Sequence, residues 1–100
     1  KNSDGIYRIP KSSILYFSSD RRTVTCFSNE REYTFYDRLD NIEDSVGPSF
    51  IRIHQRYLVN SKYIKRITSG QAELESITLP ISRACQQKAA AAFARAIMED

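Results

Sequence analysis

The sequence predicts a mainly β fold: a β-rich α+β domain of short antiparallel strands with one short internal helix and a C-terminal helix. Short runs of β-branched and aromatic residues recur between turns rich in Ser, Asn, Asp and Gly, which is typical of a meander of strands. Helical spacing of apolar residues occurs in only two places. With 100 residues, 41% of them hydrophobic and 27% charged, the chain has room for one core. We therefore expect a single domain over residues 1–100 with about seven to nine short strands.

The first third of the chain predicts strands separated by polar turns. Pro10 cannot donate a ladder hydrogen bond, so it should end a first short strand. Residues 18–22 are Ser, Asp and Arg, which we expect to form a turn. The expected strands cover residues 6–9, 14–17, 23–27 and 32–36.

The internal helix is predicted after the fourth strand. Leu39, Ile42 and Val46 follow helical spacing, and Asp37 precedes them as a candidate cap. Gly47, followed by proline, supplies a stop signal.

The rest of the chain predicts further strands and a final helix. The expected strands cover residues 50–53, 57–59, 64–68, 71–75 and 77–81. Ser82 can cap a helix over about residues 84–98, in which an alanine run combines high helix propensity with the apolar pair Phe93 and Ile97. We expect this Ala-rich end to be a packing or dimer helix.

Charge is distributed unevenly along the chain. Residues 45–72 contain no Asp or Glu and carry a formal charge of +5, whereas residues 30–44 hold six acids against two bases. The net charge of +3 therefore hides a concentrated basic patch, as a docking surface for phosphate requires. The five cations of the basic segment are Arg52, Arg56, Lys62, Lys65 and Arg66.

The sequence favours a cytoplasmic protein without a metal site. No apolar run approaches the ~20 residues needed to cross a bilayer, and the polar N-terminal residues lack the apolar core of a signal peptide. Cys26 and Cys85 lack CxxC spacing and nearby histidines, so we expect two reduced thiols.

Catalysis is poorly supported. His54 is the single histidine, and GxSxG, Walker, HExxH and GxGxxG motifs are all missing from the sequence. The acids of the internal helix are better explained as a solvated helix face than as a carboxylate cluster. We therefore expect no enzyme activity, no cofactor and no small-molecule substrate.

Strand alternation places Phe50, Arg52 and His54 on one face of a strand. Arg52 is equally compatible with a phosphate contact and with a stem that packs over Phe50. His54 is better explained as a hydrogen-bonded core or turn histidine than as a base-reading group.

Three predicted turns carry side chains that suit nucleic acid. Gln55 and Arg56 offer the donors that pair with adenine and guanine edges. Arg21 and Arg22 occupy an earlier turn, and Arg83 follows Ser82 at the start of the last helix. The three turns could converge, although each arginine alone is more often an ordinary surface residue.

Together, these segments resemble the LytTR family, a bacterial DNA-binding domain. The match runs in order from about residue 6 to residue 88. It rests on IP at 9–10, ILYF at 14–17, YTFY at 33–36, Leu39, FIRIH at 50–54, YLVN at 57–60, YI at 63–64 and LPISR at 79–83.

The resemblance implies a fold whose loops, rather than a recognition helix, enter successive major grooves of bent double-stranded DNA. It also implies the output domain of a two-component response regulator that dimerises through a receiver domain, not present in this chain, and binds paired direct repeats. The implied base contacts are Arg22, Gln55 and Arg83. The implied DNA-backbone contacts are Arg21, Thr23, Arg52, Arg56, Lys62 and Ser82.

This chain departs from the commoner family pattern at two positions. It has Gln55 where a basic residue or Asn often stands and Arg56 where a small polar residue is usual. Its base preference is therefore open, as is the choice of Arg22 over Arg21 or Thr23 as the reader of the first turn.

The main alternative is a protein-interaction module. Six tyrosines with nearby arginines have the composition of an interface hot spot for an acidic partner. RNA binding ranks lower because the aromatic stacking motif of RNA-recognition sheets is missing from the sequence. The tyrosines are Tyr7, Tyr16, Tyr33, Tyr36, Tyr57 and Tyr63.

Overall fold

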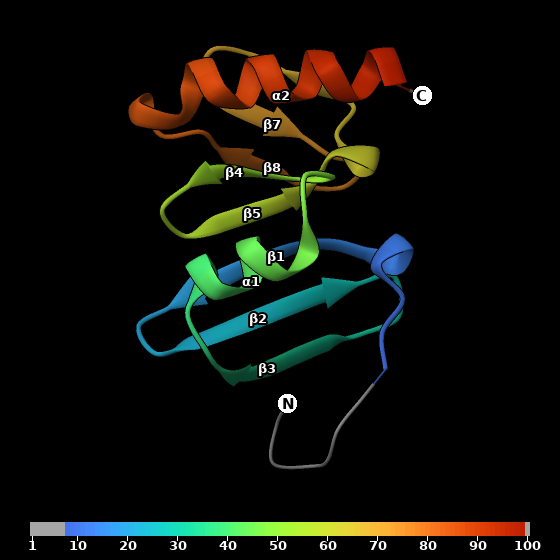
Figure 1. The fold of residues 1–100 in the computed structure, drawn as a ribbon, viewed down its shortest axis with the longest axis vertical. Coiled ribbons are helices and arrows are strands. Elements are labelled where there is room, and N and C mark those ends of the chain that lie inside the picture. Colours follow the sequence, from blue (N-terminus) through green and yellow to red (C-terminus); the bar gives the residue numbers. More distant parts are fainter. Residues whose placement is uncertain (1–7, 100) are drawn as a thin grey trace.

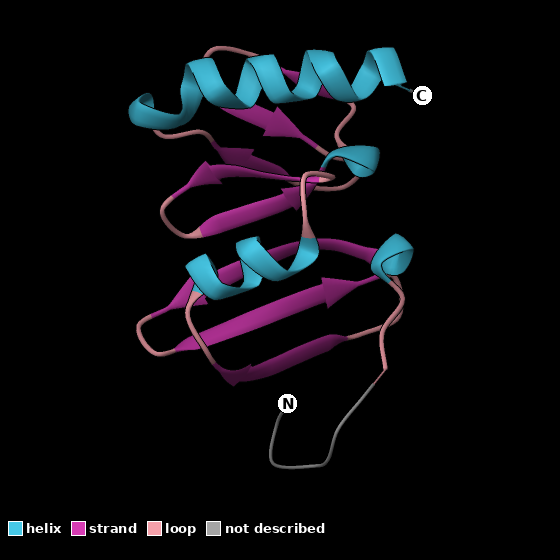
Figure 2. Cartoon of the chain, viewed as in Figure 1, coloured by secondary structure: helices cyan, strands magenta, loops and turns pink. Residues whose placement is uncertain are grey.

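Residues 8–99 are described by a computed structural model (Figures 1 and 2). One sheet has five antiparallel strands in the order β3-β2-β1-β5-β4, and a second has three in the order β6-β7-β8. The predicted mainly β fold with two α-helices is therefore confirmed. The strands are β1 Ile14–Asp20, β2 Thr23–Ser28, β3 Glu32–Tyr36, β4 Phe50–His54, β5 Tyr57–Asn60, β6 Arg66–Ile67, β7 Gln71–Glu73 and β8 Thr78–Pro80. The helices are α1 Leu39–Val46, α2 Gln86–Glu99 and the 3-10 turns η1 Lys11–Ser13, η2 Ser61–Tyr63 and η3 Arg83–Cys85.

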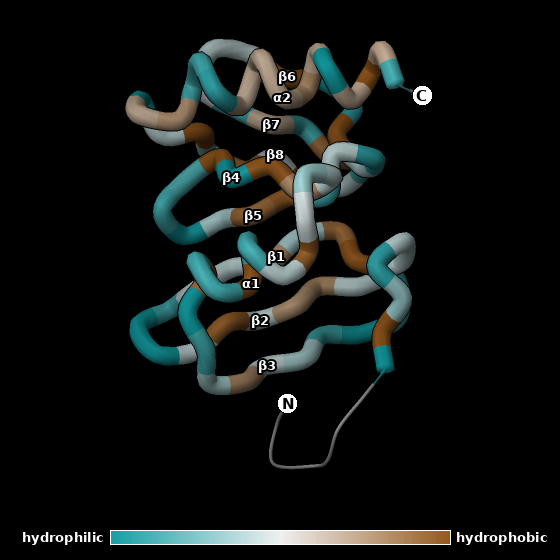
Figure 3. Tube along the Cα trace, in the orientation of Figure 1, coloured by the Kyte–Doolittle hydropathy of each residue, from teal (hydrophilic) through white to brown (hydrophobic). Residues whose placement is uncertain are grey.

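The five-stranded sheet buries apolar side chains on both faces. Phe50 and Leu58 belong to a cluster with Leu39 of α1, whereas Ile51 and Ile53 belong to a cluster with β7, β8 and α2. Successive residues of a strand point to opposite faces, so the run FIRI of β4 supplies both clusters. Figure 3 shows β4 and β5 as largely hydrophobic strands in the middle of the molecule. Fully burying one such aliphatic side chain contributes about 1.5–3 kcal/mol.

The alanine run lets α2 lie close to the sheet. Ala89 has no solvent exposure and belongs to the same cluster as Ile51 and Ile53. Ala92 and Phe93 pack against this cluster and remain partly exposed. The predicted role of the Ala-rich end in packing is thus confirmed, with α2 as the outer layer in Figure 1.

The buried side chain of Asn60 connects the end of β5 to η1, β1 and η2. It is 5% exposed, and its amide nitrogen donates to the carbonyls of Ile14 at 2.9 Å and Lys11 at 3.3 Å. Its side-chain oxygen accepts from the backbone N–H of Lys62 at 3.0 Å. The buried amide is satisfied on both sides, so its burial does not carry the cost of an unpaired polar group.

Several element boundaries differ from the sequence-based predictions. Of the expected strand over residues 6–9, positions 6 and 7 lie outside the described residues, and 8–9 have no regular structure. Residues 18–20 continue β1 instead of turning, because Ser18 pairs with Tyr57 and Ser19 donates to Arg56 O. The strand expected over 64–68 is reduced to two residues, and α2 begins at Gln86 after a 3-10 turn.

The two predicted helix caps also differ from expectation. Arg38 is the cap residue of α1, while the Asp37 carboxylate accepts from the Arg38 N–H at 2.7 Å and from the Asn41 amide at 3.1 Å. Ser82 precedes η3 without a side-chain capping bond. Among residues 8–99, no helix has the length and apolar character needed to span a membrane.

Candidate nucleic-acid interface

Backbone hydrogen bonds bring the three predicted contact turns to one end of the five-stranded sheet. The N–H of Ser19 donates to the carbonyl of Arg56 at 2.9 Å, which joins the β1–β2 turn to the β4–β5 turn. The N–H of Ser82 donates to the carbonyl of Ile53 at 2.9 Å, which places η3 beside the β4–β5 turn. Figure 1 shows the three turns one above another along its left side. We call the side chains they present, Arg21, Arg22, Thr23, Gln55, Arg56, Ser82 and Arg83, the three-turn surface.

The β1–β2 turn presents two exposed arginines. Asp20 pairs with Thr23, so Arg21 and Arg22 are the two residues of a tight hairpin turn. Thr23 Oγ1 donates to Asp20 O at 3.1 Å, and Arg22 O accepts from the N–H of Asp37 at 3.2 Å. Arg21 has a φ of 61°, a conformation that side-chain-bearing residues rarely adopt. The turn is thus held by its own bonds while both guanidinium groups stay accessible.

The β4–β5 turn presents Gln55 and Arg56, both exposed. His54 Nδ1 accepts from the N–H of Arg56 at 3.1 Å, which agrees with the predicted turn histidine. Arg56 Nε donates to Ser19 O at 3.1 Å, and its Nη2 lies 3.7 Å from the carboxylate of Asp20. That exposed ion pair contributes little energy, so a phosphate can compete for the guanidinium.

Arg52 differs from the exposed phosphate contact implied by the family resemblance. Its side chain is only 19% exposed, and Nη1 lies 2.9 Å from Asp40 and 2.7 Å from Glu43 on α1. Its Nε donates to His54 O at 2.8 Å and its Nη2 to Gln55 O at 2.8 Å. Partial burial lowers the pKa of this guanidinium, but the bonds to the two carboxylates raise it overall. Arg52 therefore connects the β4–β5 turn to α1, and its N–H donors form hydrogen bonds inside the protein.

Arg83 lies in η3, beside the β4–β5 turn, and is exposed. A shallow hollow of about 430 Å³ separates this turn from η3 and is lined by Gln55, Ser82 and Cys85 among others. Gln55 thus lines a concave strip of surface, and Arg83 lies in the 3-10 turn between two other lining residues, Ser82 and Ala84. A DNA base edge is a planar group that such a strip can receive.

Lys62 is not brought together with the other predicted contact residues. It lies in η2, after β5 has crossed the sheet from Tyr57 to Asn60. A strand rises about 3.3 Å per residue, so Lys62 lies roughly 15 Å or more from the β4–β5 turn. The structure thus places it at the opposite end of the sheet from the three-turn surface.

The acidic segment explains part of the charge pattern. α1 carries Asp40 and Glu43 against Arg52, so acids of this segment neutralise one cation of the basic segment, and Glu73 pairs with another, Arg66, at 2.8 Å. The exposed cations of the three-turn surface are Arg21, Arg22, Arg56 and Arg83. Their fields add because the hydrogen-bonded turns hold them at one end.

Tyr36 is a neighbour of this surface that sequence reasoning did not assign to DNA. It pairs with Thr23 across β2 and β3 and is 83% exposed. Its position at the last residue of a predicted strand was the available signal. Two tyrosines of the alternative prediction have partners inside the protein: Tyr16 is 7% exposed and stacks on Phe27 with 4.4 Å between the ring centroids, and the Tyr63 hydroxyl donates to Ser12 O.

The chemistry of this end of the molecule is that of hydrogen-bond donation to anions and base edges.

Among residues 8–99 there is no group of three His, Cys, Asp or Glu side chains that could hold a metal ion. Both cysteines are free thiols, and burial raises the pKa of Cys26 to about 11. That thiol stays protonated at neutral pH, as expected of a core residue.

Comparison with known proteins identifies related domains. The family model for the LytTr DNA-binding domain matches residues 4–94. The chain is 33% identical over 63 residues to the positive alginate biosynthesis regulatory protein of Pseudomonas aeruginosa, which covers 63% of this chain and 25% of that protein. It is 28% identical over 65 residues to the transcriptional regulatory protein LytR of Staphylococcus aureus, covering 64% and 26%. The chain thus spans about a quarter of the length of these curated relatives.

A solved LytTr DNA-binding domain from Bacillus cereus has the same fold. It superimposes with a TM-score of 0.78 at 24% identity, covering 88% of this chain and 87% of that one. The fold expected from the sequence resemblance is therefore confirmed.

Proposed function

Because this chain belongs to the LytTR family of DNA-binding domains, we propose that it recognises specific duplex DNA through the three-turn surface. Phosphate contacts supply most of the affinity and the turn side chains supply discrimination between sequences. The surface acts by binding, without catalysing a reaction.

The observation that carries this proposal is the convergence of the three turns. The β1–β2 and β4–β5 turns are separated by two strand spacings, roughly 10 Å. A major groove is about 12 Å wide, so these neighbouring hairpin turns match its dimensions. The family pattern of loops entering successive grooves is compatible with η3 lying further along the same side of the molecule.

We assign the roles that the family resemblance implies. Arg22, Gln55 and Arg83 contact base edges, where a guanidinium can pair with two acceptors and an amide with a donor and an acceptor. Arg21, Thr23, Arg56 and Ser82 contact the DNA backbone. Arg52 acts as a positioning residue for the β4–β5 turn, since its donors are occupied by Asp40, Glu43 and two carbonyls.

We further propose that the domain serves a cytoplasmic response regulator. Two of its relatives carry the names of regulatory proteins, and this chain matches about a quarter of each. In that setting a receiver domain outside this chain brings two copies onto paired direct repeats. Each copy then contributes one three-turn surface.

The direct test is enrichment of DNA sites from a randomised duplex library, followed by affinity measurements with Arg83→Ala and Gln55→Ala. A recurrent motif is expected, and Arg83→Ala should cost about 1–3 kcal/mol on that motif if the side chain pairs with a guanine. The loss on random duplex should be much smaller.

Arg95→Ala provides the matched control, because Arg95 is an exposed arginine on α2 at the other end of the sheet. It should leave the preferred motif and the affinity unchanged. A folded protein that enriches no motif, or an Arg83→Ala variant that loses equally on random DNA, contradicts the proposal.

A further inference from the structure

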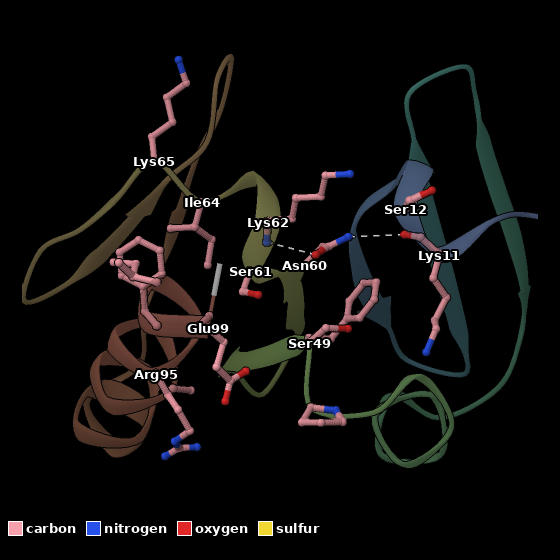
Figure 4. Close-up of a pocket in the computed structure, with 16 residues that line it drawn as sticks. Lys11, Ser12, Ser49, Asn60, Ser61, Lys62, Ile64, Lys65, Arg95 and Glu99 are labelled. Atoms are coloured by element: carbon pink, nitrogen blue, oxygen red, sulfur yellow. Dashed lines mark hydrogen bonds between the residues drawn. The ribbon is translucent and has the colours of Figure 1, made fainter.

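A second concave surface lies at the end of the sheet opposite the three-turn surface. It is a groove of about 800 Å³ between the C-terminal half of α2 on one side and η1 on the other. Figure 4 shows Asn60 and Ser61, where β5 passes into η2, between these two walls. A volume of this size is within the range of small-ligand and peptide pockets.

The rim of the groove is strongly basic. Four cations and one carboxylate, Glu99, line it, and Figure 4 shows the cationic side chains arranged around the edge. The four cations are Lys11, Lys62, Lys65 and Arg95.

These cations are weakly neutralised by the rest of the protein. Lys11 Nζ donates to the carbonyl of Val46 at 2.8 Å, and Lys65 Nζ lies 3.8 Å from Glu75 in an exposed pair. Within the part of the chain that the structure describes, Lys62 and Arg95 take part in no ion pair. The groove therefore retains positive charge that is available to an external anion.

The α2 wall of the groove is apolar. Phe93, Ala96 and Ile97 line it together with the buried Ile64. Ile97 is 56% exposed, so a large aliphatic side chain of α2 faces water at the groove. An apolar wall inside a ring of charges is the usual composition of a peptide or protein interface.

From this combination we propose that the groove binds an acidic peptide segment of a partner protein, one that carries apolar side chains among its carboxylates. The carboxylates of the peptide form ion pairs with Lys62 and Arg95, while its apolar side chains cover Phe93 and Ile97. DNA fits less well, because its sugar-phosphate backbone has no large apolar side chain to cover this wall and the three-turn surface is at the other end. The binding of this partner is independent of the DNA-binding function proposed above.

The test is selection of peptides from a displayed random library on this chain, followed by affinity measurement of the enriched peptides. We expect enriched sequences to combine Asp or Glu with aromatic or aliphatic residues. The charge-reversing double substitution Lys62→Glu/Arg95→Glu should weaken their binding by about tenfold or more. Ile97→Ser should weaken it without any change of charge.

Arg31→Glu/Arg38→Glu is the matched control, because it changes the net charge equally at exposed positions outside the groove. It should leave peptide affinity within about twofold at physiological salt. Circular dichroism and thermal melting establish that all variants fold, and Ile97→Ser, at an exposed site, keeps the proposal testable if the double reversal does not fold.

Three outcomes overturn the proposal. The first is the absence of enriched peptides, or enrichment of peptides without acidic residues. The second is a loss of DNA affinity in Lys62→Glu/Arg95→Glu as large as that in Arg83→Ala, which assigns the groove to DNA. The third is concentration-dependent self-association in sedimentation that Ile97→Ser abolishes, which makes a second copy of this chain the occupant.

Discussion

At the scale of single residues, the neighbours of a side chain decide what its charge can do. Arg52 lies in the most basic segment of the chain, yet two carboxylates of α1 and two carbonyls of the β4–β5 turn take up its donors. A guanidinium group suits this task because its donors project in a fixed planar fork. The three-turn surface thus includes a turn whose shape depends on an ion pair behind it.

This arrangement predicts that removing the two acids of α1 that hold Arg52 changes DNA binding by the three-turn surface. Asp40→Asn/Glu43→Gln makes the protein more positive, so electrostatics alone predicts tighter DNA binding. If Arg52 positions the turn, the double substitution should instead lower affinity for the preferred site, because Arg52 loses the carboxylates that orient it. We expect a loss of about tenfold on the preferred site and little loss on random duplex.

Asp44→Asn is the control for that experiment. It removes an exposed carboxylate of the same helix that forms no ion pair with Arg52 among the described residues. Arg52→Gln completes the comparison: a positioning residue leaves the salt dependence of binding unchanged, whereas a phosphate contact lowers its slope by about one. If Asp40→Asn/Glu43→Gln binds DNA more tightly and Arg52→Gln lowers the salt slope, Arg52 contacts a DNA phosphate and is not a positioning residue.

Arg21 allows backbone strain and charge to be separated. Its φ of 61° costs a non-glycine residue about 1 kcal/mol or more, and glycine has no such cost. Arg21→Gly should therefore unfold at higher denaturant than Arg21→Ala, by about 0.5–1 kcal/mol. Both variants should lose the same affinity for DNA, because both lose the same charge. An Arg21→Ala protein as stable as Arg21→Gly would contradict the strain argument.

At the scale of elements, α1 connects the core to the surface. Its apolar residues Leu39, Ile42 and Val46 pack beneath the sheet, and its acids hold Arg52. The start of the helix is tied to the β1–β2 turn through the bond from Asp37 N to Arg22 O. A helix of eight residues cannot be stable alone, so its geometry comes from these contacts.

Asp37 should make the stability of this junction depend on pH. Its hydrogen bond from the Arg38 N–H, and then the one from Asn41, lower the pKa of the carboxyl below its ordinary value. A lowered folded-state pKa adds stability above the ordinary aspartate value near 4, and this stability is lost as the pH falls through the folded value. Asp37→Ala should therefore destabilise the protein more at pH 7 than at pH 2–3.

Asp37→Asn is the informative companion, since the amide oxygen still accepts a hydrogen bond without the charge. The difference between the native protein and this variant should disappear below the folded pKa in urea titrations over pH 2–7. A difference that stays constant over this range would assign the effect to packing alone.

Much of the element order was predictable, because apolar alternation and turn residues are local signals. The strand over 32–36 and the helix beginning at Leu39 follow these signals. Residues 18–20 do not, since Ser18 and Ser19 have weak strand propensity and are held extended by pairing with β2 and, at Ser18, with β5. Likewise, η3 delays α2 beyond its predicted start, where Ser82 bonds to β4 instead of capping the helix.

The candidate site was predictable turn by turn but not as an assembly. The residues of each turn were visible in the sequence, whereas their convergence depends on β1 pairing with β5, a contact between distant segments. The family resemblance implies a DNA-backbone contact for Lys62, although β5 places this residue at the far end of the sheet. The role of Arg52 could not be read locally, because its carboxylate partners come from another element.

At the scale of the whole molecule, positive charge is divided between two opposite ends of one sheet. The three-turn surface holds four exposed arginines, and the groove beside α2 holds four further cations. The net charge counts both groups of cations together, whereas the fold holds them at opposite ends. Their effects on DNA binding should therefore be distinguishable by salt dependence.

If the four exposed arginines of the three-turn surface each displace one counterion from DNA, the slope of log affinity against log salt should be roughly −4. Arg21→Ala and Arg56→Ala should each reduce the magnitude of this slope by about one, because each removes a cation that we assign to the DNA backbone. Lys65→Ala should leave the slope unchanged, although it removes the same formal charge, because Lys65 lies at the groove end of the molecule. Titrations of one duplex from low to physiological salt measure all four slopes. Equal reductions for the three variants would mean that DNA senses only the net charge of the protein, and a flat slope for the native protein would rule out phosphate contacts as the source of affinity.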